Sequence, residues 1–442
     1  MQVLLLVFTF VFALGLVQRG PCMQTDWNNS DVRYAKMCYS DIPYLYTGRG
    51  FAEQHWPYAD SHGRYPAMEY PVGISYLAWI ASELTTIDAA GPPVSVRAAA
   101  DPADLWGMPG MATEVNANFA ITAVLLFLCG LIAAWFLAGA HRRRPWDALP
   151  FVLSPCLLVT GLVNWDLLAV AFTAGALWAW SRGKPLWAGL LLGLGVATKL
   201  YPLFLLGAFL IVAIRRRRLS WFVWAAGGAA VAWVLANLPA LLSSVDLWKV
   251  FWKFNSTRGA DLGSLWYVLS LKGHSFSAHQ INLVSWVLFL AACAAILALG
   301  LLVKQPPRVA QLAFLIVAAF LLVNKVYSPQ YVLWLLPLAV LARPRWRDLL
   351  IWQACELFYF ASVWWFLGGW LTSASTNAGS PIYEIAIVVR MLGEIYLMAV
   401  VVRDILWPGH DPVRADGVTD DPMTPEVAAR PRPQPVNEGV AG

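Results

Sequence analysis

Apolar runs long enough to cross a bilayer recur from one end of this 442-residue chain to the other. Hydrophobic residues make up 59% of the sequence and charged residues only 13%. A typical soluble domain has about 25% charged residues. Length alone would allow two or three soluble domains, but the composition argues against them. The sequence therefore predicts an all-α polytopic membrane protein.

Short clusters of basic residues between the apolar runs predict the topology, because Lys and Arg gather in cytoplasmic loops. If every cluster is cytoplasmic, an even number of crossings separates consecutive clusters. This rule predicts about twelve transmembrane helices in the plasma membrane, with both termini cytoplasmic. The same distribution accounts for the net charge of +5, so no nucleic-acid partner is needed. The clusters are Arg142–Arg144, Arg182 with Lys184, Arg215–Arg218, Lys304 with Arg308, Arg343 with Arg345 and Arg347, and Arg403 with the tail arginines.

The predicted organisation is one transmembrane domain over residues 1–407 and a disordered cytoplasmic tail over residues 408–442, which is rich in proline and charge. Residues 18–111 form the first extracytoplasmic loop. Within it, the apolar run Tyr70–Thr86 must begin and end outside, so we expect a helix on or dipping into the outer leaflet. The alternative, a true span there, would place Arg142–Arg144 outside.

The spans after Ala148 are short and are paired through polar or proline-containing hinges. Such hinges are tolerated at membrane depth only where protein buries them or where they line a wet cavity. We therefore expect the outer hinges to ring a cavity. These hinges are Asn164–Asp166, Thr198–Pro202 and Asn324–Gln330.

The six cysteines and six histidines show no metal-ligand spacing. Cys22 and Cys38 share the first polar loop and could form a disulfide if that loop faces an oxidising compartment. The other four cysteines lie in apolar runs and are expected to be core residues. A divalent cation stays possible, because several acids face the same side.

The polar segment Cys22–Gly73 holds the main candidates for chemistry. Asp41 could act as a general base toward an acceptor hydroxyl, or it could cap a helix that starts near Pro43. Glu69 could bind substrate hydroxyls, bind a metal or cap a helix. Asp60 is a further candidate in the same segment.

Lys199 and Lys325 go against the positive-inside bias and lie at outer hinges. They could bind the phosphate of a lipid, or they could extend to the interface. Arg390 and Glu394 are spaced to pair on one face of the last span, a structural role, although Arg390 could also turn into the cavity. No glycine-rich nucleotide motif is present, so a sugar-nucleotide donor is unsupported.

The order of short motifs resembles glycosyltransferase family 87. These are the polyprenol-phosphate-mannose-dependent mannosyltransferases of actinobacteria, within the GT-C superfamily. The resemblance runs from Met1 to about Trp407. The motifs that carry it are Asp41-x-x-Tyr44-x-Tyr46-x-x-Arg49, Pro57–Asp60, Glu69–Val72, Asn164–Asp166, Thr198–Pro202 and Lys325–Tyr331.

The resemblance implies a GT-C fold with surface helices in the first loop and Asp41 as the base. Val72 stands where the family usually has a second proline. The donor would be a polyprenyl-phosphate sugar, with mannose preferred over arabinose as the interpretation. The sugar would be transferred with inversion to an extracytoplasmic glycolipid, lipoglycan or protein. Positive side chains, Lys199 and Lys325 with Arg49 or Arg390, would stabilise the leaving phosphate. The predicted substrate-binding residues are Glu69, Tyr44, Arg49, Asp60, Lys199, Tyr201, Lys325, Tyr327, Gln330, Asp166 and Arg390.

Two other classes of protein compete with this interpretation. A secondary transporter would also fit twelve spans, but the halves of the chain show no similarity and a polar loop of about fifty residues would be unusual there. A membrane partner that has lost activity is the third hypothesis. The presence of Asp41 with the lysine hinges argues weakly against it.

Overall fold

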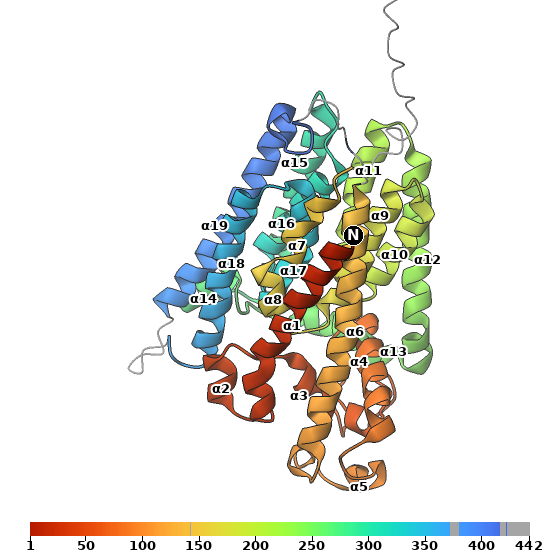
Figure 1. Cartoon of the computed structure of the whole chain (residues 1–442), viewed down its shortest axis with the longest axis vertical. Helices are drawn as coiled ribbons and strands as arrows, with labels where there is room; N and C mark the ends of the chain where they lie inside the picture. Colours follow the sequence, from red (N-terminus) through yellow and green to blue (C-terminus); the bar gives the residue numbers. More distant parts are fainter. Residues whose placement is uncertain (142, 372–379, 416–420, 422–442) are drawn as a thin grey trace, which may run out of the picture.

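The computed structural model describes residues 1–141, 143–371, 380–415 and 421. These residues form helices and connecting segments, with no strand among them (Figure 1). An all-helical chain is expected in lipid, because a helix satisfies its own backbone hydrogen bonds. Among the described residues, six helices are long and apolar enough to cross a membrane: α1 (Gln2–Gln24), α6 (Met111–Ala140), α12 (Leu219–Ser243), α15 (Ala278–Leu302), α18 (Trp346–Leu367) and α19 (Pro381–Leu406).

Shorter apolar helices complete the bundle, as the paired hinges predict. Five of them are α9 (Asp166–Ser181), α10 (Pro185–Val196), η5 with α11 (Tyr201–Phe204 and Leu205–Arg215), α16 (Val309–Val323), and η6 with α17 (Pro329–Tyr331 and Val332–Ala342). One further segment is broken near Pro155 into η4 (Pro145–Ala148), α7 (Leu149–Val152) and α8 (Pro155–Thr160). The six long helices and these shorter apolar segments fit an all-α polytopic membrane fold, and the count of about twelve spans stays a prediction.

The first loop forms the lower end of the molecule in Figure 1. It contains the predicted short helices: α2 (Ser30–Ala35), α3 (Asp41–Gly48), η1 (Phe51–Glu53), α4 (Val72–Thr85), η2 (Thr86–Asp88), α5 (Val94–Ala99) and η3 (Leu105–Gly107). Helix α4 corresponds to the apolar run that was expected on the outer leaflet, and it packs against α6. Its depth in the membrane stays a prediction.

The first helix is longer than the sequence suggested. Helix α1 continues through Gln24, six residues past the point where the loop was predicted to begin, and the membrane boundary there stays a prediction. Arg19 can stay inside because its guanidinium donates to the carbonyls of Met37 at 3.1 Å and Val159 at 2.7 Å. The last turn of α1 carries Cys22, which forms a disulfide with Cys38 (Cα–Cα 5.8 Å).

Helices α10 and α12 lie side by side and make an extensive contact along their length (Figure 1). Small residues face each other there. A Cβ atom on Gly189 would lie 2.0 Å from the Ala225 carbonyl oxygen, and one on Gly193 would lie 2.2 Å from that of Ala229. Glycines four residues apart let two membrane helices approach closely, so this pair fixes α10 against α12.

The segment after α19 is ordered at its start, which corrects the predicted tail boundary at Pro408. Pro408–His410 form η7, and Asp411 is fully buried. The Asp411 carboxylate accepts hydrogen bonds from the buried Arg308 guanidinium at 2.8 and 3.0 Å. Arg308 also donates to the carbonyls of Leu341 and Ala342, so the segment closes the ends of α16 and α17.

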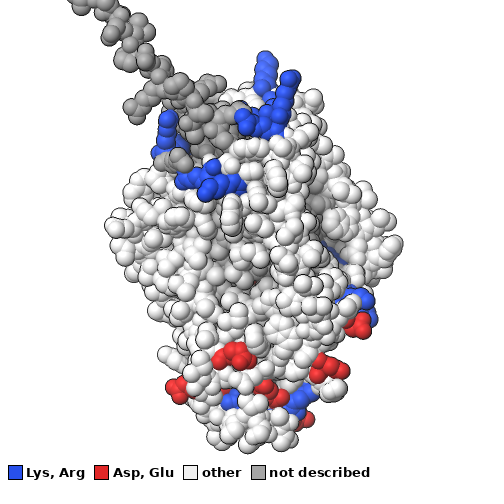
Figure 2. Space-filling view, turned by 90° about the vertical axis from the view of Figure 1, so that its right-hand side faces the viewer, with Lys and Arg blue, Asp and Glu red and all other residues white. Residues whose placement is uncertain are grey.

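Charge is distributed unevenly along the long axis of the molecule. In Figure 2 most Lys and Arg side chains gather at one end of the molecule, and the Asp and Glu side chains gather at the opposite end, formed by the first loop, together with a few Lys and Arg. A broad band between them carries almost no charge in this view. Near the loop end, α13 (Val245–Thr257) and α14 (Leu265–Leu271) connect α12 to α15.

Candidate active site

Asp41 is the first residue of α3, and Ser40 is the residue that caps this helix. The Ser40 hydroxyl accepts from the Ile42 amide at 3.3 Å. The Asp41 amide donates to the Val163 carbonyl at 2.9 Å, which fixes the start of α3 against the turn before α9. The capping role that competed with a chemical role therefore belongs to Ser40, and the Asp41 side chain is left for other contacts.

The Asp41 carboxylate accepts hydrogen bonds from three side chains. Tyr39 Oη donates to Oδ1 at 2.8 Å. Tyr70 Oη donates to Oδ2 at 3.2 Å, and Asn164 Nδ2 donates to the same oxygen at 2.6 Å. Three donors therefore hold the carboxylate in place, and the residue as a whole is partly exposed.

Two opposing effects act on the pKa of Asp41. Burial is the largest influence and raises the pKa, because it penalises the charged form. The hydrogen bonds from Tyr39 and Asn164, and the positive charge of Lys199, lower it. Burial dominates, so the pKa of Asp41 lies above the ordinary aspartate value. A raised pKa makes a carboxylate a stronger base.

Lys199 lies next to this carboxylate and is itself mostly buried. Its Nζ is 3.5 Å from Asp166 Oδ2 and 5.3 Å from the centre of the Tyr70 ring. Within the described part of the chain, Asp166 Oδ2 accepts no hydrogen bond, while Oδ1 accepts one from Trp334 Nε1 at 2.6 Å. Lys199 therefore does not extend to the interface but points into the same region as Asp41.

Gly73 brings the loop and the bundle together at this point. Its amide donates to the Ala197 carbonyl at 2.8 Å, and a Cβ atom there would lie 2.5 Å from Thr198 Oγ1. The first turn of α4 and the residues just after α10 can meet only because position 73 has no side chain. This contact places Tyr70 beside Lys199.

Three predicted binding residues lie deeper in the bundle. Tyr201 is fully buried, stacks on Trp334 (5.0 Å between ring centres) and accepts a hydrogen bond from the Thr173 hydroxyl at 3.0 Å. Tyr327 is also buried, and its hydroxyl donates to Glu356 at 3.0 Å. Gln330 is buried, and its Oε1 has no hydrogen-bond partner among the described residues.

Lys325 belongs to a second group of charges at the α16–η6 hinge. Its Nζ donates to the Asn255 carbonyl at 2.5 Å and to Asn282 Oδ1 at 2.6 Å. The Lys325 carbonyl accepts from the Asp261 amide at 2.9 Å, and Asp261 forms an ion pair with Arg258 at 2.5 Å. Since a lysine has three N–H donors, Lys325 keeps one donor for a ligand.

Arg390 and Glu394 form the predicted pair on α19, at 2.8 Å. Arg390 also lies over the Tyr327 ring, 3.8 Å from its centre, and Glu356 accepts from that tyrosine's hydroxyl. Arg390 is almost fully buried in this cluster. Arg390 therefore packs between Glu394 and the ring of Tyr327, which lies in the hinge between α16 and η6.

The remaining predicted residues lie in the first loop. Arg49 and Glu69 form a two-pronged ion pair with N–O distances of 2.7 and 2.8 Å, immediately before Tyr70. Tyr44 donates to the Trp27 carbonyl at 2.7 Å. Asp60 lies on an exposed turn, where its side chain accepts from the His62 amide at 2.8 Å.

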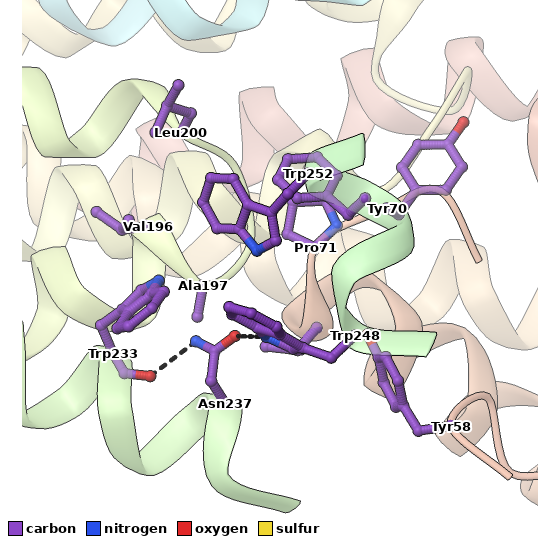
Figure 3. Close-up of a pocket in the computed structure, with 12 residues that line it drawn as sticks. Tyr58, Tyr70, Pro71, Val196, Ala197, Leu200, Trp233, Asn237, Trp248 and Trp252 are labelled. Atoms are coloured by element: carbon purple, nitrogen blue, oxygen red, sulfur yellow. Dashed lines mark hydrogen bonds between the residues drawn. The ribbon is translucent and has the colours of Figure 1, made fainter. Parts of the chain in front are cut away.

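A small apolar pocket adjoins Tyr70 (Figure 3). Its one amide side chain, Asn237, already accepts from Trp248 Nε1 at 2.7 Å and donates to the Trp233 carbonyl at 2.8 Å. Tyr70 stands at the edge with its hydroxyl pointing away from the pocket. The lining consists of Tyr58, Tyr70, Pro71, Val72, Val196, Ala197, Leu200, Trp233, Asn237, Trp248, Phe251 and Trp252.

Among the residues that the structure describes, no three His, Cys, Asp or Glu side chains group in a way that could hold a metal ion. The structure also shows residues that the sequence did not single out as site residues. Tyr39 and Trp334 were missed, and Asn164 was noted only as part of a hinge motif. The one signal in the sequence that could have identified Asn164 is that it shares a hinge with the acid Asp166.

A model of glycosyltransferase family 87 matches residues 106–324, about half of the chain. This chain belongs to glycosyltransferase family 87. The match contains Asn164, Asp166 and Lys199, whereas Asp41 and Tyr70 precede it. No curated protein sequence gave a significant match.

Membership makes the protein a membrane glycosyltransferase, which uses a sugar donor and an acceptor, and it gives no support to the transporter hypothesis. At the loop end of the bundle, the Asp41 carboxylate lies within the electrostatic influence of the mostly buried Lys199. In this arrangement the Asp41 carboxylate can accept a proton, and the Lys199 ammonium can bind a negatively charged group close by.

Proposed function

We propose that the enzyme transfers mannose from a polyprenyl-phosphate donor to a glycolipid or glycan acceptor on the extracytoplasmic side, in cell-envelope biosynthesis. The observation that carries the proposal is the Asp41 carboxylate, held by three donors and bordered by Lys199. The apolar pocket beside Tyr70 supports a lipid-linked substrate, because its lining is aromatic and aliphatic.

The proposed reaction is a single displacement at the anomeric carbon. Asp41 takes the proton of the acceptor hydroxyl, and the oxygen attacks the carbon from the face opposite the phosphate. The bond between the anomeric carbon and the phosphate oxygen breaks, and polyprenyl phosphate leaves with the electron pair. One displacement inverts the configuration of the sugar.

Lys199 is the proposed ligand of the leaving phosphate. Its contact with Asp166 is long, at 3.5 Å, so its N–H donors remain available for an anion. Lys325 and Arg258 add positive charge at the neighbouring hinge. Such charges act most strongly where water is excluded.

Two observations support the proposed orientation of the enzyme. The basic end in Figure 2 fits the cytoplasmic side, and the proposed topology has both termini on that side. The loop end carries the Cys22–Cys38 disulfide, which fits an oxidising compartment outside the plasma membrane. The proposed active site then faces outward.

The test is transfer of labelled mannose from polyprenyl-phosphate mannose to a membrane lipid extract by the purified enzyme. Asp41→Asn should lower the rate about 10²–10⁴-fold, the usual contribution of a general base. Asp31→Asn, an exposed acid in the same loop, is the matched control and should keep wild-type activity. Equal rates for wild type and Asp41→Asn would overturn the role of Asp41. Transfer from an arabinose donor alone would replace mannose, and retention at the anomeric carbon of the product would exclude the single displacement.

A further inference from the structure

The hydrogen bonds to Asp41 are unequal at its two carboxylate oxygens. We infer that Asn164, Tyr39 and Tyr70 are positioning residues that leave Oδ1 as the oxygen that takes the acceptor proton. This inference rests on the proposed function, in which Asp41 is the base. It adds three residues to the catalytic apparatus, from three separate parts of the chain.

Counting acceptor positions identifies the reactive oxygen. A carboxylate has about four positions that can accept a hydrogen bond, two on each oxygen. Oδ2 accepts from Asn164 at 2.6 Å and from Tyr70 at 3.2 Å, so both of its positions are filled. Within the described part of the chain, Oδ1 accepts one hydrogen bond, from Tyr39 at 2.8 Å, and keeps one position. An acceptor hydroxyl can therefore bind to Oδ1 without displacing a protein donor.

Asn164 has only one orientation that satisfies its neighbours. Its Oδ1 accepts from the Trp165 amide at 2.6 Å. Its Nδ2 lies 2.6 Å from Asp41 Oδ2 and 3.1 Å from Tyr70 Oη, which uses both hydrogens. A flipped amide would place its oxygen against the carboxylate and its nitrogen against the Trp165 amide. The three residues Asp41, Tyr70 and Asn164 thus form a closed ring of hydrogen bonds.

The backbone reinforces this arrangement. Asp41 donates its amide to the carbonyl of Val163, the residue directly before Asn164. The hinge before α9 therefore holds both the main chain and the side chain of the base. Tyr70 in turn contacts Asp41 through its hydroxyl and Lys199 through its ring face, so it spaces the base from the cation.

Positioning has a kinetic signature that general structural damage does not share. Asn164→Ala removes a donor that stabilises the charged carboxylate, so the acid limb of the kcat/KM–pH profile should move to higher pH. Loss of a hydrogen bond to a charged group should lower kcat about 10–100-fold, while the donor KM changes little. Tyr39→Phe removes one oxygen atom and should shift the limb in the same direction.

Tyr65→Phe is the matched control, because it also removes a tyrosine hydroxyl that donates to a carboxylate of this loop. The Tyr65 hydroxyl donates to Glu53 at 2.6 Å. The kcat/KM–pH profile of Tyr65→Phe should equal that of the wild type. If Asn164→Ala and Tyr39→Phe lower kcat but leave the acid limb in place, or keep wild-type kinetics, the positioning role is overturned. A wild-type rate in Asp41→Asn would instead overturn the role of Asp41 as the base in the proposed function.

Discussion

At the scale of single residues, Asp41 owes its proposed reactivity to burial that outweighs its hydrogen bonds. Its pKa is raised, so it should gain a proton at a higher pH than an ordinary aspartate, about 3.9. Because the proposed base must be ionised, activity should fall on acidification, with a midpoint above that value. The measurement is the kcat/KM–pH profile of the wild-type enzyme. A midpoint at or below the ordinary value would contradict the effect of burial.

Lys199 and Asp166 allow stability to be separated from catalysis. Lys199→Met leaves the buried Asp166 carboxylate without its cation, which should cost about 3–5 kcal/mol. Asp166→Asn in the same chain removes the unpaired charge and should restore most of that stability. Thermal unfolding and transfer assays of both variants are the measurements. Transfer should stay low in the double variant if Lys199 binds phosphate, and recovery with stability would show that it does not.

Single residues were predicted unevenly from the sequence. Asp41, Glu69 and Lys199 stand out because a charge among apolar residues is visible in the sequence alone. The partners of Asp41 are not visible in that way, since Asn164 is 123 residues distant and lies beside it only after folding. A tyrosine such as Tyr39 fits a membrane interface equally well, so its hydrogen bond could not be foreseen.

At the scale of elements, the contact between α10 and α12 depends on glycine. Gly193→Leu would drive a side chain into the Ala229 backbone, and overpacking of this kind typically costs about 1–3 kcal/mol or more. Gly227→Leu, on the same pair of helices, is the control, because a Cβ atom added at position 227 would meet no neighbouring heavy atom within 4 Å. Thermal unfolding in detergent should show a large effect only for position 193. Equal midpoints would refute the close contact.

The disulfide joins the end of α1 to the segment that carries Tyr39 and Asp41. The two cysteines are 16 residues apart in the sequence, so Cys22→Ser should cost about 3 kcal/mol. We also expect slower transfer, because Cys38 directly precedes Tyr39. Unfolding and activity can be compared with those of Cys129→Ser, which replaces a free thiol. A variant at Cys22 with the stability and rate of the wild type would remove this role.

The sequence predicted the apolar helices and hinges better than it predicted where each helix ends. Hydropathy and the basic clusters predicted the helices and hinges, because both reflect the bilayer itself. The end of α1 was missed, because carbonyls of Met37 and Val159 satisfy Arg19 inside the structure. A sequence shows that Arg19 is charged, but not that distant carbonyls surround it.

At the scale of the whole molecule, a buried ion pair ties the C-terminal segment to the bundle. Asp411→Ala would leave the buried Arg308 guanidinium without its carboxylate, at a cost of about 3–5 kcal/mol. Asp246→Ala, whose side chain is 96% exposed, should change stability by less than about 0.5 kcal/mol. Thermal unfolding of the two variants tests this difference. The composition of residues 408–442 predicted a disordered, solvent-exposed tail. Composition does not show that Asp411 is buried as the ion-pair partner of Arg308.

The ring of hydrogen bonds around Asp41 also has a consequence for the order of synthesis. Asp41 and Tyr70 leave the ribosome early, but Asn164 follows only after α6 and the broken segment α7–α8 have been made. A nascent chain that ends before the α9 hinge thus has its carboxylate without the amide that orients it. An enzyme divided into two fragments would keep this ring within one fragment if the cut fell between α14 and α15, where a Cβ atom on Gly273 would meet open space.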